Sequence, residues 1–331
     1  MPLRAIAGHA PLRDLLARAV SRETLPPSLL FDGPEGVGKR LTAVALAQAL
    51  NCERPMDIDG SRDACGECPP CRRILRGVHA DVLVIEPAET GIIRLDQVRD
   101  AIDRAAYRPF EGRRRVVIID AADALNVEAQ NALLKTLEEP PPASVFVLVT
   151  DRPDLLLPTV RSRCQRLRFG PLAAADVADA LIRDHGVAPA DAHAAAAASG
   201  GSVGRALESH AEDAMEARDA AATLLKGAAA STDPRRRLEG AKMLAGGGDR
   251  DELSRRLLAL ASLVRDLGLL FSRADDRALA NADLRPDLEA LGRFFDADRA
   301  LRAFEAIDRA LAALDRNASP KIVADWIALT I

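Results

Sequence analysis

Four short apolar runs in the first half of the chain constrain its fold more than any other feature. The runs occupy 28–31, 81–86, 116–120 and 145–150. Apolar and polar residues do not alternate within them, so each run predicts a strand that is buried on both faces. Segments with apolar residues at helical spacing separate the runs, at 41–50, 96–106 and 126–138. Because strands alternate with helices, we expect an α/β domain with a parallel sheet and right-handed crossovers.

The second half of the chain has a different character. Strand-like runs end at about residue 169, and the sequence becomes rich in Ala, Leu and Arg, with apolar residues at helical spacing. One apolar stripe consists of Leu253, Leu257, Leu260, Leu263 and Leu267, and a second of Leu301, Phe304, Leu311 and Leu314. We therefore predict an α/β domain at 1–168 with an inserted module at about 50–75, a small helical domain at 169–208 and a larger helical domain at 209–331.

Composition and charge exclude several classes of protein. Hydrophobic residues are 48% of the sequence and charged residues 28%, which excludes wholesale disorder. The net charge of −4 disfavours a strongly basic protein that wraps nucleic acid. No apolar run approaches the roughly 18 residues that span a bilayer, and the N-terminal segment does not resemble a signal peptide. We therefore expect a cytoplasmic protein without a membrane segment.

A glycine-rich octapeptide, GPEGVGKR, lies between the first predicted strand and the first predicted helix of the sheet. It matches the phosphate-binding loop pattern G-x-x-x-x-G-K-[ST] except at its last position. Gly33, Gly36 and Gly38 would let backbone N–H groups turn toward phosphate oxygens, and Lys39 would add a positive charge. Arg40 replaces the hydroxyl that ligates Mg²⁺, and a guanidinium has no lone pair to offer and repels a dication. We expect that nucleotide or Mg²⁺ at this loop has no catalytic use.

The third apolar run ends in Asp120, the position at which phosphate-loop ATPases hold Mg²⁺ through water. Hydrolytic members often carry a Glu at the next position, where it polarises the attacking water. Here the next residue is Ala121, which has no proton acceptor. The changes at the metal position and at the base position both indicate that hydrolysis has been lost, so we predict no independent catalysis.

A cluster of cysteines predicts a structural metal site in the inserted module. Cys65, Cys68 and Cys71 lie within CGECPPC, and Cys52 lies upstream. The glycine and prolines favour turns, which lets closely spaced thiolates converge on one ion. Four sulfur ligands at about 2.3 Å complete a tetrahedral Zn²⁺ site with no open position. Because the spacing from Cys52 to Cys65 is long, His79 remains an alternative fourth ligand.

In this order, these features resemble the clamp-loader branch of the AAA+ ATPases, and within it the delta-prime family of bacterial DNA polymerase III subunits. The resemblance also rests on IAGH at 6–9, NALLKTLEEPP at 131–141, TVRSRC at 159–164 and GSVGRAL at 201–207. A motor subunit would carry a hydroxyl after Lys39 and a Glu after Asp120, whereas delta-prime subunits hydrolyse nothing. The resemblance implies an AAA+ phosphate-loop domain with a zinc knuckle, a helical lid and a helical collar.

The resemblance also implies roles for single residues. Arg163 is in the position of an arginine finger, a guanidinium that enters the ATP site of the next subunit and neutralises charge developing on the γ-phosphate. Thr150 and Arg205 are in the positions of the first and second sensors, but with a degenerate pocket we expect both to be structural. For Arg161 and Arg166 we expect surface ion pairs.

A run of three arginines, 113–115, precedes the third predicted strand. Charge runs are most often solvated, and the net charge of −4 does not favour nucleic acid. We therefore expect a solvated edge at this position rather than a DNA contact.

The partners implied by the resemblance are the ATPase motor subunits and the delta subunit of a hetero-oligomer, and through them the sliding clamp and primed DNA. In that assembly the chain would be part of a DNA-directed DNA polymerase holoenzyme without being a polymerase itself. Two alternatives remain open. One is an active AAA+ motor subunit that tolerates Arg40, and the other is a zinc-dependent DNA-binding regulatory protein on a degenerate nucleotide fold.

Overall fold

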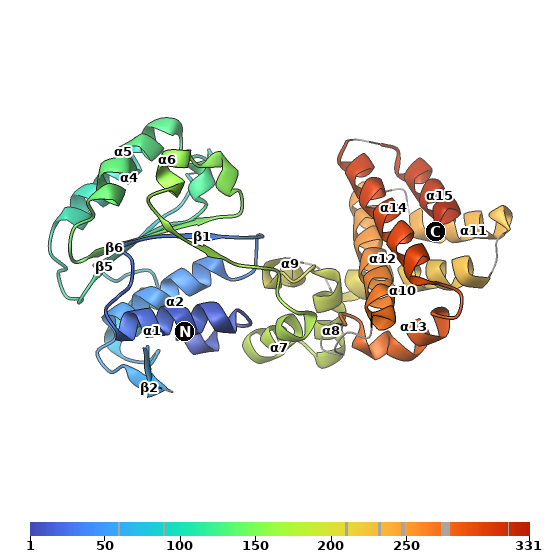
Figure 1. The fold of residues 1–331 in the computed structure, drawn as a ribbon, viewed down its shortest axis with the longest axis horizontal. Coiled ribbons are helices and arrows are strands. Elements are labelled where there is room, and N and C mark those ends of the chain that lie inside the picture. The colour runs from blue at the N-terminus through green and yellow to red at the C-terminus, as the bar shows by residue number, and fades with distance from the viewer. Residues whose placement is uncertain are drawn as a thin grey trace. The chain divides into compact units, whose positions relative to one another are not determined.

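The computed structural model describes residues 1–58, 60–88, 90–208, 211–230, 233–245, 249–272, 279–316 and 318–331. The chain divides into two compact units, Met1–Pro171 and Leu172–Ile331 (Figure 1). The first unit contains a parallel sheet with helices and the second unit contains helices, so the predicted fold class is confirmed. The further boundary that the sequence suggests at residue 208 stays a prediction.

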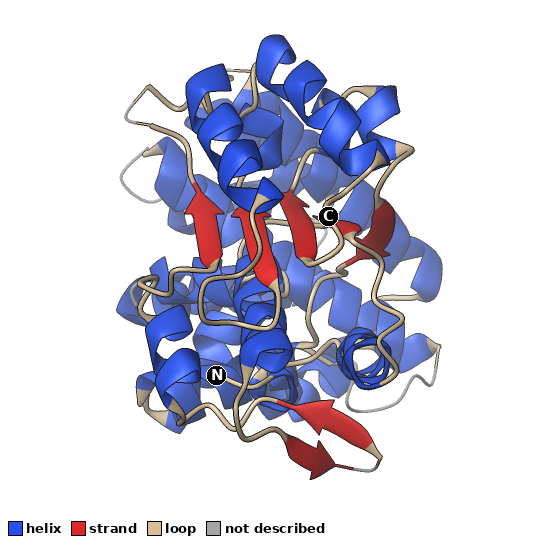
Figure 2. Cartoon of the chain, turned by 90° about the vertical axis from the view of Figure 1, so that its left-hand side faces the viewer, coloured by secondary structure: helices blue, strands red, loops and turns tan. Residues whose placement is uncertain are grey.

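The first unit is built on a five-stranded parallel sheet, drawn in red in Figure 2. In spatial order its strands are β4 (Val82–Ile85), β5 (Arg115–Ile119), β6 (Ser144–Thr150), β1 (Ser28–Asp32) and β7 (Gln165–Arg168). The four strands predicted from the apolar runs are confirmed. The sequence does not predict β7, because only Leu167 is buried in this edge strand.

Helices cover both faces of this sheet. Their bounds are α1 (Ala10–Ser21), α2 (Lys39–Asn51), α3 (Pro69–Leu75), α4 (Leu95–Ala106), α5 (Val127–Glu138) and α6 (Pro158–Arg161), with short 3-10 helices η1 (Leu3–Ala5), η2 (Ala122–Ala124) and η3 (Pro153–Leu155). The α1 and α2 helices contribute to one hydrophobic cluster, and α4, α5 and α6 contribute to a second cluster on the opposite face. The sheet lies between the two clusters.

Successive residues of each central strand enter different clusters. Val116 and Ile118 of β5 pack on the side of α2, whereas Val117 and Ile119 pack on the side of α5. All five residues of β5 are buried. A strand with apolar clusters on both sides needs apolar residues at every position, which explains the continuous runs in the sequence.

A small hairpin forms part of the inserted module. It consists of β2 (Met56–Ile58) and β3 (Ser61–Asp63), which pair antiparallel. The sequence does not predict this hairpin, because the strands have three residues each and are mostly polar.

The second unit consists of helices in the part of the chain that the structure describes. They are α7 (Ala174–His185), α8 (Pro189–Ala198), α9 (Val203–Glu208), α10 (Ala211–Ala230), α11 (Pro234–Ala245), α12 (Arg250–Phe271), η5 (Ala282–Leu284), α13 (Arg285–Leu291), α14 (Ala297–Asp315) and α15 (Pro320–Thr330). Among the described residues, no helix combines the length and the apolar character that a membrane span requires.

One of the two predicted apolar stripes of this unit is correct, and the other is correct only for its last two residues, Leu311 and Leu314. The leucine stripe of α12, from Leu253 to Leu267, is fully buried. On α14, however, Leu301 is 59% exposed and Phe304 is 41% exposed. The buried face of α14 consists of the predicted Leu314 together with Ala300, Ala303, Ala306, Ile307 and Ala310, which the prediction did not include. Small alanine side chains fill the space between closely packed helices, whereas the prediction gave more weight to large side chains.

Candidate functional site

The loop between β1 and α2 adopts a conformation that requires glycine. Gly33, Gly36 and Gly38 all have positive φ angles, and Gly38 is the N-cap residue of α2. A Cβ atom on Gly33 would lie 2.0 Å from the carbonyl oxygen of Phe169, so the loop passes directly against the chain that follows β7. The strand, loop and helix therefore have the arrangement that the phosphate-loop motif predicts.

Lys39 is buried and binds the loop itself. Its Nζ atom donates to the carbonyl oxygens of Gly33 at 2.7 Å and Pro34 at 2.6 Å. Burial lowers the pKa of Lys39, and the carboxylates of Asp151 and Asp120 oppose this shift. The lysine therefore ties the start of α2 to the start of the loop.

Arg40 pairs with the carboxylate that the motif assigns to Mg²⁺. Its Nη1 atom donates to Oδ2 of Asp120 at 3.0 Å, and its Nη2 atom forms an ion pair with Glu86. Asp120 follows β5 and Glu86 follows β4, so one guanidinium joins the start of α2 to the ends of two neighbouring strands. A positive charge built into the chain thus contacts the carboxylate that would otherwise support a metal ion.

Thr150, at the end of β6, forms its hydrogen bonds with residues of the same chain. Its Oγ1 atom donates to Oδ1 of Asp123 at 2.8 Å, and Arg152 donates twice to Oδ2 of the same carboxylate, at 3.0 and 2.7 Å. The Asp123 side chain is only 3% exposed. This threonine therefore stabilises a largely buried carboxylate beside the loop.

Arg163 lies at the surface after α6. Its Nη1 atom donates to the carbonyl oxygen of Thr159 at 3.0 Å, and its Nη2 atom is 3.3 Å from Oε1 of Glu138. The Arg163 side chain is 31% exposed and that of Glu138 is 59% exposed. Such an exposed pair contributes about 0–1 kcal/mol, so the guanidinium can exchange this partner for another at low cost.

The other predicted arginines are placed as follows. Arg161 pairs with Asp154 at 3.0 Å, and Arg166 donates twice to Asp32, at 2.9 and 2.6 Å, so the predicted ion pairs are confirmed. Arg205 is exposed on α9 of the second unit. Its role as a second sensor stays a prediction.

The prediction of a solvated edge at 113–115 is wrong for Arg115, which is 8% exposed and pairs with Asp81 at 2.7 Å. The N–H groups of Arg113 and Arg114 donate to Oδ1 of Asn51, at 2.8 and 3.0 Å. The arginine run is therefore a structural connection between the end of α2 and the start of β5.

Asp81 is the centre of this connection and has no signal in the sequence. It is completely buried and accepts hydrogen bonds from the N–H groups of Phe110, Glu111 and Gly112, at 2.7, 2.9 and 2.7 Å. Burial raises the pKa of Asp81, but Arg115 and these three donors outweigh burial and lower it to about 2.

The four cysteines of the inserted module converge. Their Sγ atoms all lie within 4.8 Å of one another, with Cys52 at 3.6 Å from Cys65 and at 3.8 Å from Cys68. Four sulfurs bound to one Zn²⁺ ion at about 2.3 Å would be about 3.8 Å apart. The donor set and its spacing therefore fit a tetrahedral metal ion. Cys71 completes the set and is fully buried.

Backbone N–H groups lower the pKa of one of the four thiols, whereas burial raises the pKa of Cys52 and of Cys71. Burial raises the pKa of Cys65, but hydrogen bonds from the N–H groups of Glu67 and Cys68 and from neighbouring thiols outweigh it, so the pKa falls to about 7. A thiol with this pKa is readily deprotonated to the thiolate that binds metal. His79 does not belong to the cluster, because its Nδ1 atom accepts from the N–H group of Asp81 and its Nε2 atom faces Glu111.

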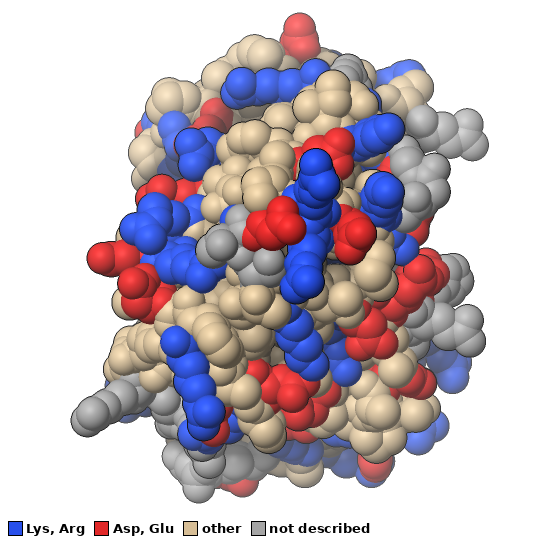
Figure 3. Space-filling view, turned by 90° about the vertical axis from the view of Figure 1, so that its right-hand side faces the viewer, with Lys and Arg blue, Asp and Glu red and all other residues tan. Residues whose placement is uncertain are grey.

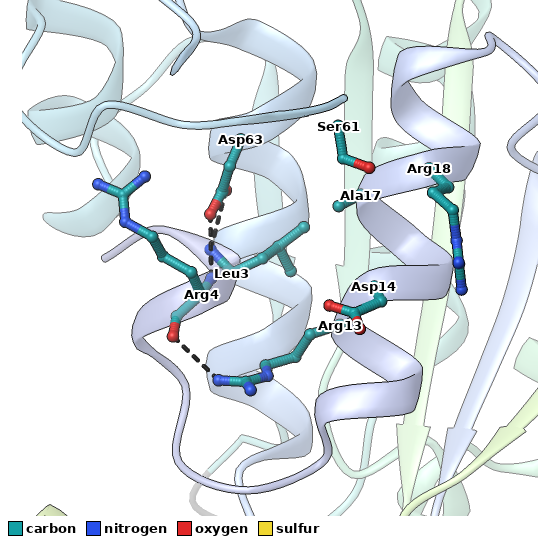
Figure 4. A pocket seen from close by; sticks show the side chains of 8 residues that line it. All are labelled: Leu3, Arg4, Arg13, Asp14, Ala17, Arg18, Ser61 and Asp63. Carbon is teal, nitrogen blue, oxygen red and sulfur yellow. Dashed lines mark hydrogen bonds between the residues drawn. The ribbon is translucent and has the colours of Figure 1, made fainter. Parts of the chain in front are cut away.

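The cysteine module is fixed to the sheet domain by hydrogen bonds. Asp63 accepts from the N–H groups of Leu3 and Arg4, both at 3.0 Å, as Figure 4 shows. Gln48 of α2 donates to the carbonyl oxygen of Cys71 at 2.6 Å, and Arg113 donates to that of Cys52 at 2.9 Å. The module is therefore a rigid part of the first unit.

Comparison with known proteins places this first unit among replication proteins. A family model described as DNA polymerase III, delta subunit, matches residues 8–173. The chain is 45% identical over 136 residues to DNA polymerase III subunit delta' from Pseudomonas aeruginosa. This alignment covers 41% of this chain and 40% of the relative. It is 34% identical over 168 residues to subunit delta' from Bacillus subtilis, covering 51% and 49%, and 37% identical over 165 residues to subunit tau from the same organism, covering 50% and 28%.

The matches thus span less than half the length of each of these relatives. Among solved structures, a DNA polymerase III gamma-subunit-related protein from Thermotoga maritima aligns with 96% of this chain and 97% of its own, at a TM-score of 0.41 and 21% identity.

The cysteine cluster leads to a prediction of metal content. The wild-type chain should contain about one ion, and Cys68→Ser should reduce this to less than about half and lower the unfolding temperature, since the ligand set is incomplete. Elemental analysis and thermal denaturation measure the two effects. Cys164→Ser is the matched control, because Cys164 lies outside the cluster and should leave the metal content unchanged. Metal-free wild-type protein of full stability would contradict the site.

A second prediction concerns acid stability. Because the pKa of Asp81 is about 2 in the fold against an ordinary 3.8, its carboxylate stabilises the fold above about pH 4, and this contribution disappears as the pH falls toward 2. Asp81→Asn should lower the free energy of unfolding at neutral pH by about 3 kcal/mol and make it less dependent on pH between 4 and 2. Urea denaturation at several pH values measures both effects. Asp103→Asn, on the exposed side of α4, is the control and should behave like the wild type. If the stability of the wild type, Asp81→Asn and Asp103→Asn depended equally on pH, the role of Asp81 would be disproved.

Proposed function

The chain belongs to the family described as DNA polymerase III, delta subunit, and from this premise we propose that it is a non-hydrolysing subunit of a clamp loader. A clamp loader uses ATP to place a sliding clamp on primed DNA. In this proposal the chain contributes a fixed framework and a catalytic side chain for a neighbour, and it performs no turnover at its own loop.

The observation that carries this proposal is the pairing of Arg40 with Asp120 and Glu86. The guanidinium of Arg40 is hydrogen-bonded to the Asp120 carboxylate that a Mg²⁺ ion would need, and it has no lone pair with which to bind a metal itself. The adjacent Ala121 has no atom that can accept a proton from water. Both features support the proposal that this loop does not hydrolyse ATP.

The exposed side chain of Arg163 supports the second half of the proposal. An arginine finger must reach a phosphate on another subunit, so it has to be at the surface and weakly bound within its own chain. Arg163 is 31% exposed, and its carboxylate partner among the described residues is the exposed Glu138; its Nη1 atom also donates to the carbonyl oxygen of Thr159. Arg166, by contrast, is bound to Asp32 by two hydrogen bonds.

The metal in the cysteine module is proposed to be Zn²⁺ with a structural role. Four thiolates are ligands that Zn²⁺ prefers, and four protein ligands leave no position for substrate or water. The module then stays ordered without taking part in a reaction.

Exposed apolar side chains on the second unit support assembly with other subunits. On α14 and α15 they are Leu301, Phe304, Ile322, Trp326 and Leu329. A helical collar buries such residues between subunits, and we propose the motor subunits and the delta subunit as partners, with the clamp and primed DNA bound through the assembly.

The charge distribution gives little support to the alternative of a DNA-binding regulator. On the face of the molecule shown in Figure 3, Lys and Arg side chains are interspersed with Asp and Glu. The whole chain carries a net charge of −4. A protein that binds DNA by itself would need a continuous basic surface.

A prediction separates the proposal from the motor-subunit alternative. The purified chain should show no Mg²⁺-dependent ATP hydrolysis, and Lys39→Ala should leave this background rate unchanged, because the loop does no chemistry. A phosphate-release assay measures the rate. Mg²⁺-dependent turnover that Lys39→Ala abolishes would establish the motor subunit instead.

The last prediction in this section tests Arg163. In a complex reconstituted with the motor and delta subunits, Arg163→Ala should reduce hydrolysis at the adjoining ATP site by about 10³-fold, since the transition-state charge loses its cation. Single-turnover ATPase measurements with clamp and primed DNA measure the total hydrolysis. The part of the total that comes from the adjoining site should be lost.

Arg161→Ala is the matched control for that experiment, because Arg161 is also a surface arginine with one carboxylate partner. It should leave hydrolysis unchanged, and both variants should assemble like the wild type in size-exclusion chromatography. An intact complex in which Arg163→Ala has the full rate would exclude the arginine finger.

A further inference from the structure

A cavity of about 350 Å³ opens at the end of the sheet where the strands begin. It is lined by Pro27 before β1 and by Ser144 and Val145 at the start of β6, whereas the phosphate loop follows the other end of β1. The cavity is therefore separate from the degenerate nucleotide site. Nothing in the proposed function uses it.

Part of the lining of this cavity, called here the apolar floor, is aliphatic. Val20, Leu25, Leu50 and Val145 contribute apolar side chains, and the prolines at 140–142 form one side. No aromatic residue lines the cavity. A volume of this size and composition accommodates one or two apolar side chains of a ligand.

A second part of the lining, called here the rim, is basic. Arg62, Arg113 and Arg114 lie around it, against a single acidic residue, Glu23. Hydrogen bonds to backbone carbonyl oxygens fix two of the guanidinium groups, with Arg113 bonded to Cys52 at 2.9 Å and Arg114 to Pro142 at 2.6 Å. Both groups retain further N–H donors, because a guanidinium has five. Arg62 is exposed, and its side chain has no ion-pair partner in the part of the chain that the structure describes.

The cysteine module builds one wall of the cavity. Pro55 and Arg62 lie between Cys52 and Cys65 in the sequence. Because these two cysteines are held together in the cluster, the cluster fixes the position of the segment that carries Pro55 and Arg62. The N–H group of Arg62 donates to Oγ of Ser21 at 2.5 Å, which holds the wall against the end of α1. The bond from Arg113 to Cys52 holds the opposite rim against the same module.

We propose that this cavity binds an extended acidic peptide segment of a partner protein. An aliphatic or aromatic anchor side chain of the segment enters the apolar floor, and Asp or Glu residues beside the anchor pair with Arg62, Arg113 and Arg114. Arginine forms bidentate pairs with carboxylates, which favours acidic partners at such a rim. A nucleic acid fits less well, because single strands bind through bases stacked on aromatic side chains, and the lining has none.

The experiment selects peptides from a random display library on the full-length, metal-loaded chain. The selected sequences should contain Asp or Glu within a few residues of Leu, Ile or Phe. The strongest of them, synthesised with a fluorescent label, should bind at least about tenfold more weakly to Arg62→Glu, because a like charge then faces its carboxylates. Removal of the metal with a chelator should weaken binding as well, since the wall loses its support.

Arg22→Glu is the matched control, because Arg22 is exposed at the end of α1 and does not line the cavity. It makes the same change of charge and should bind the peptide like the wild type. A second variant, Ala19→Trp, places a large side chain at the lining and should block the peptide without any change of charge. Circular dichroism confirms that each variant is folded.

Several outcomes would overturn the proposal. They are enrichment no greater than on an unrelated protein, selection of sequences without acidic residues, and peptide binding that Arg62→Glu and Ala19→Trp leave unchanged. Binding of a single-stranded oligonucleotide that depends on Arg62, with no peptide selected, would assign the cavity to nucleic acid instead. None of these results depends on ATP hydrolysis, so they leave the proposed clamp-loader function unaffected.

Discussion

The buried carboxylate of Asp81 is the interaction on which one end of the first unit depends. It accepts three backbone N–H groups from one loop and pairs with Arg115, which begins β5. The same arginine run binds Asn51 at the end of α2 and Cys52 in the cysteine cluster. Removal of this one charge would leave the guanidinium of Arg115 and the three N–H groups of the loop without their partner, because a broken buried ion pair leaves an uncompensated charge.

The opposite end of the sheet is held by a second set of charges. Lys39 binds the loop that precedes it, and Arg40 joins Asp120 to Glu86. In an ATPase of this fold, the nucleotide and its metal would hold these elements together. In this chain the side chains of two consecutive residues, Lys39 and Arg40, make contacts between these elements.

The sequence predicts elements where local pattern and packing agree. Four strands are found because they are buried on both faces, whereas β7 and the β2–β3 hairpin lie at edges and carry mostly polar residues. Most of the buried face of α14 is missed because alanines form it. At the site, the motifs identify Arg40 and the four cysteines, but not Asp81, since a single Asp before a strand has no distinctive pattern. The partners of the arginine run at 113–115 come from distant segments, so no local rule reveals them.

The bridge that Arg40 forms has one further consequence. A link made by a covalently attached cation is intramolecular, so dilution of the chain does not break it. The pair is nevertheless largely exposed, with the side chains of Arg40 and Glu86 at 53% and 49%, so dissolved salt weakens it by screening. In the proposed clamp loader, this chain would need no bound ion to connect the start of α2 with the ends of β4 and β5.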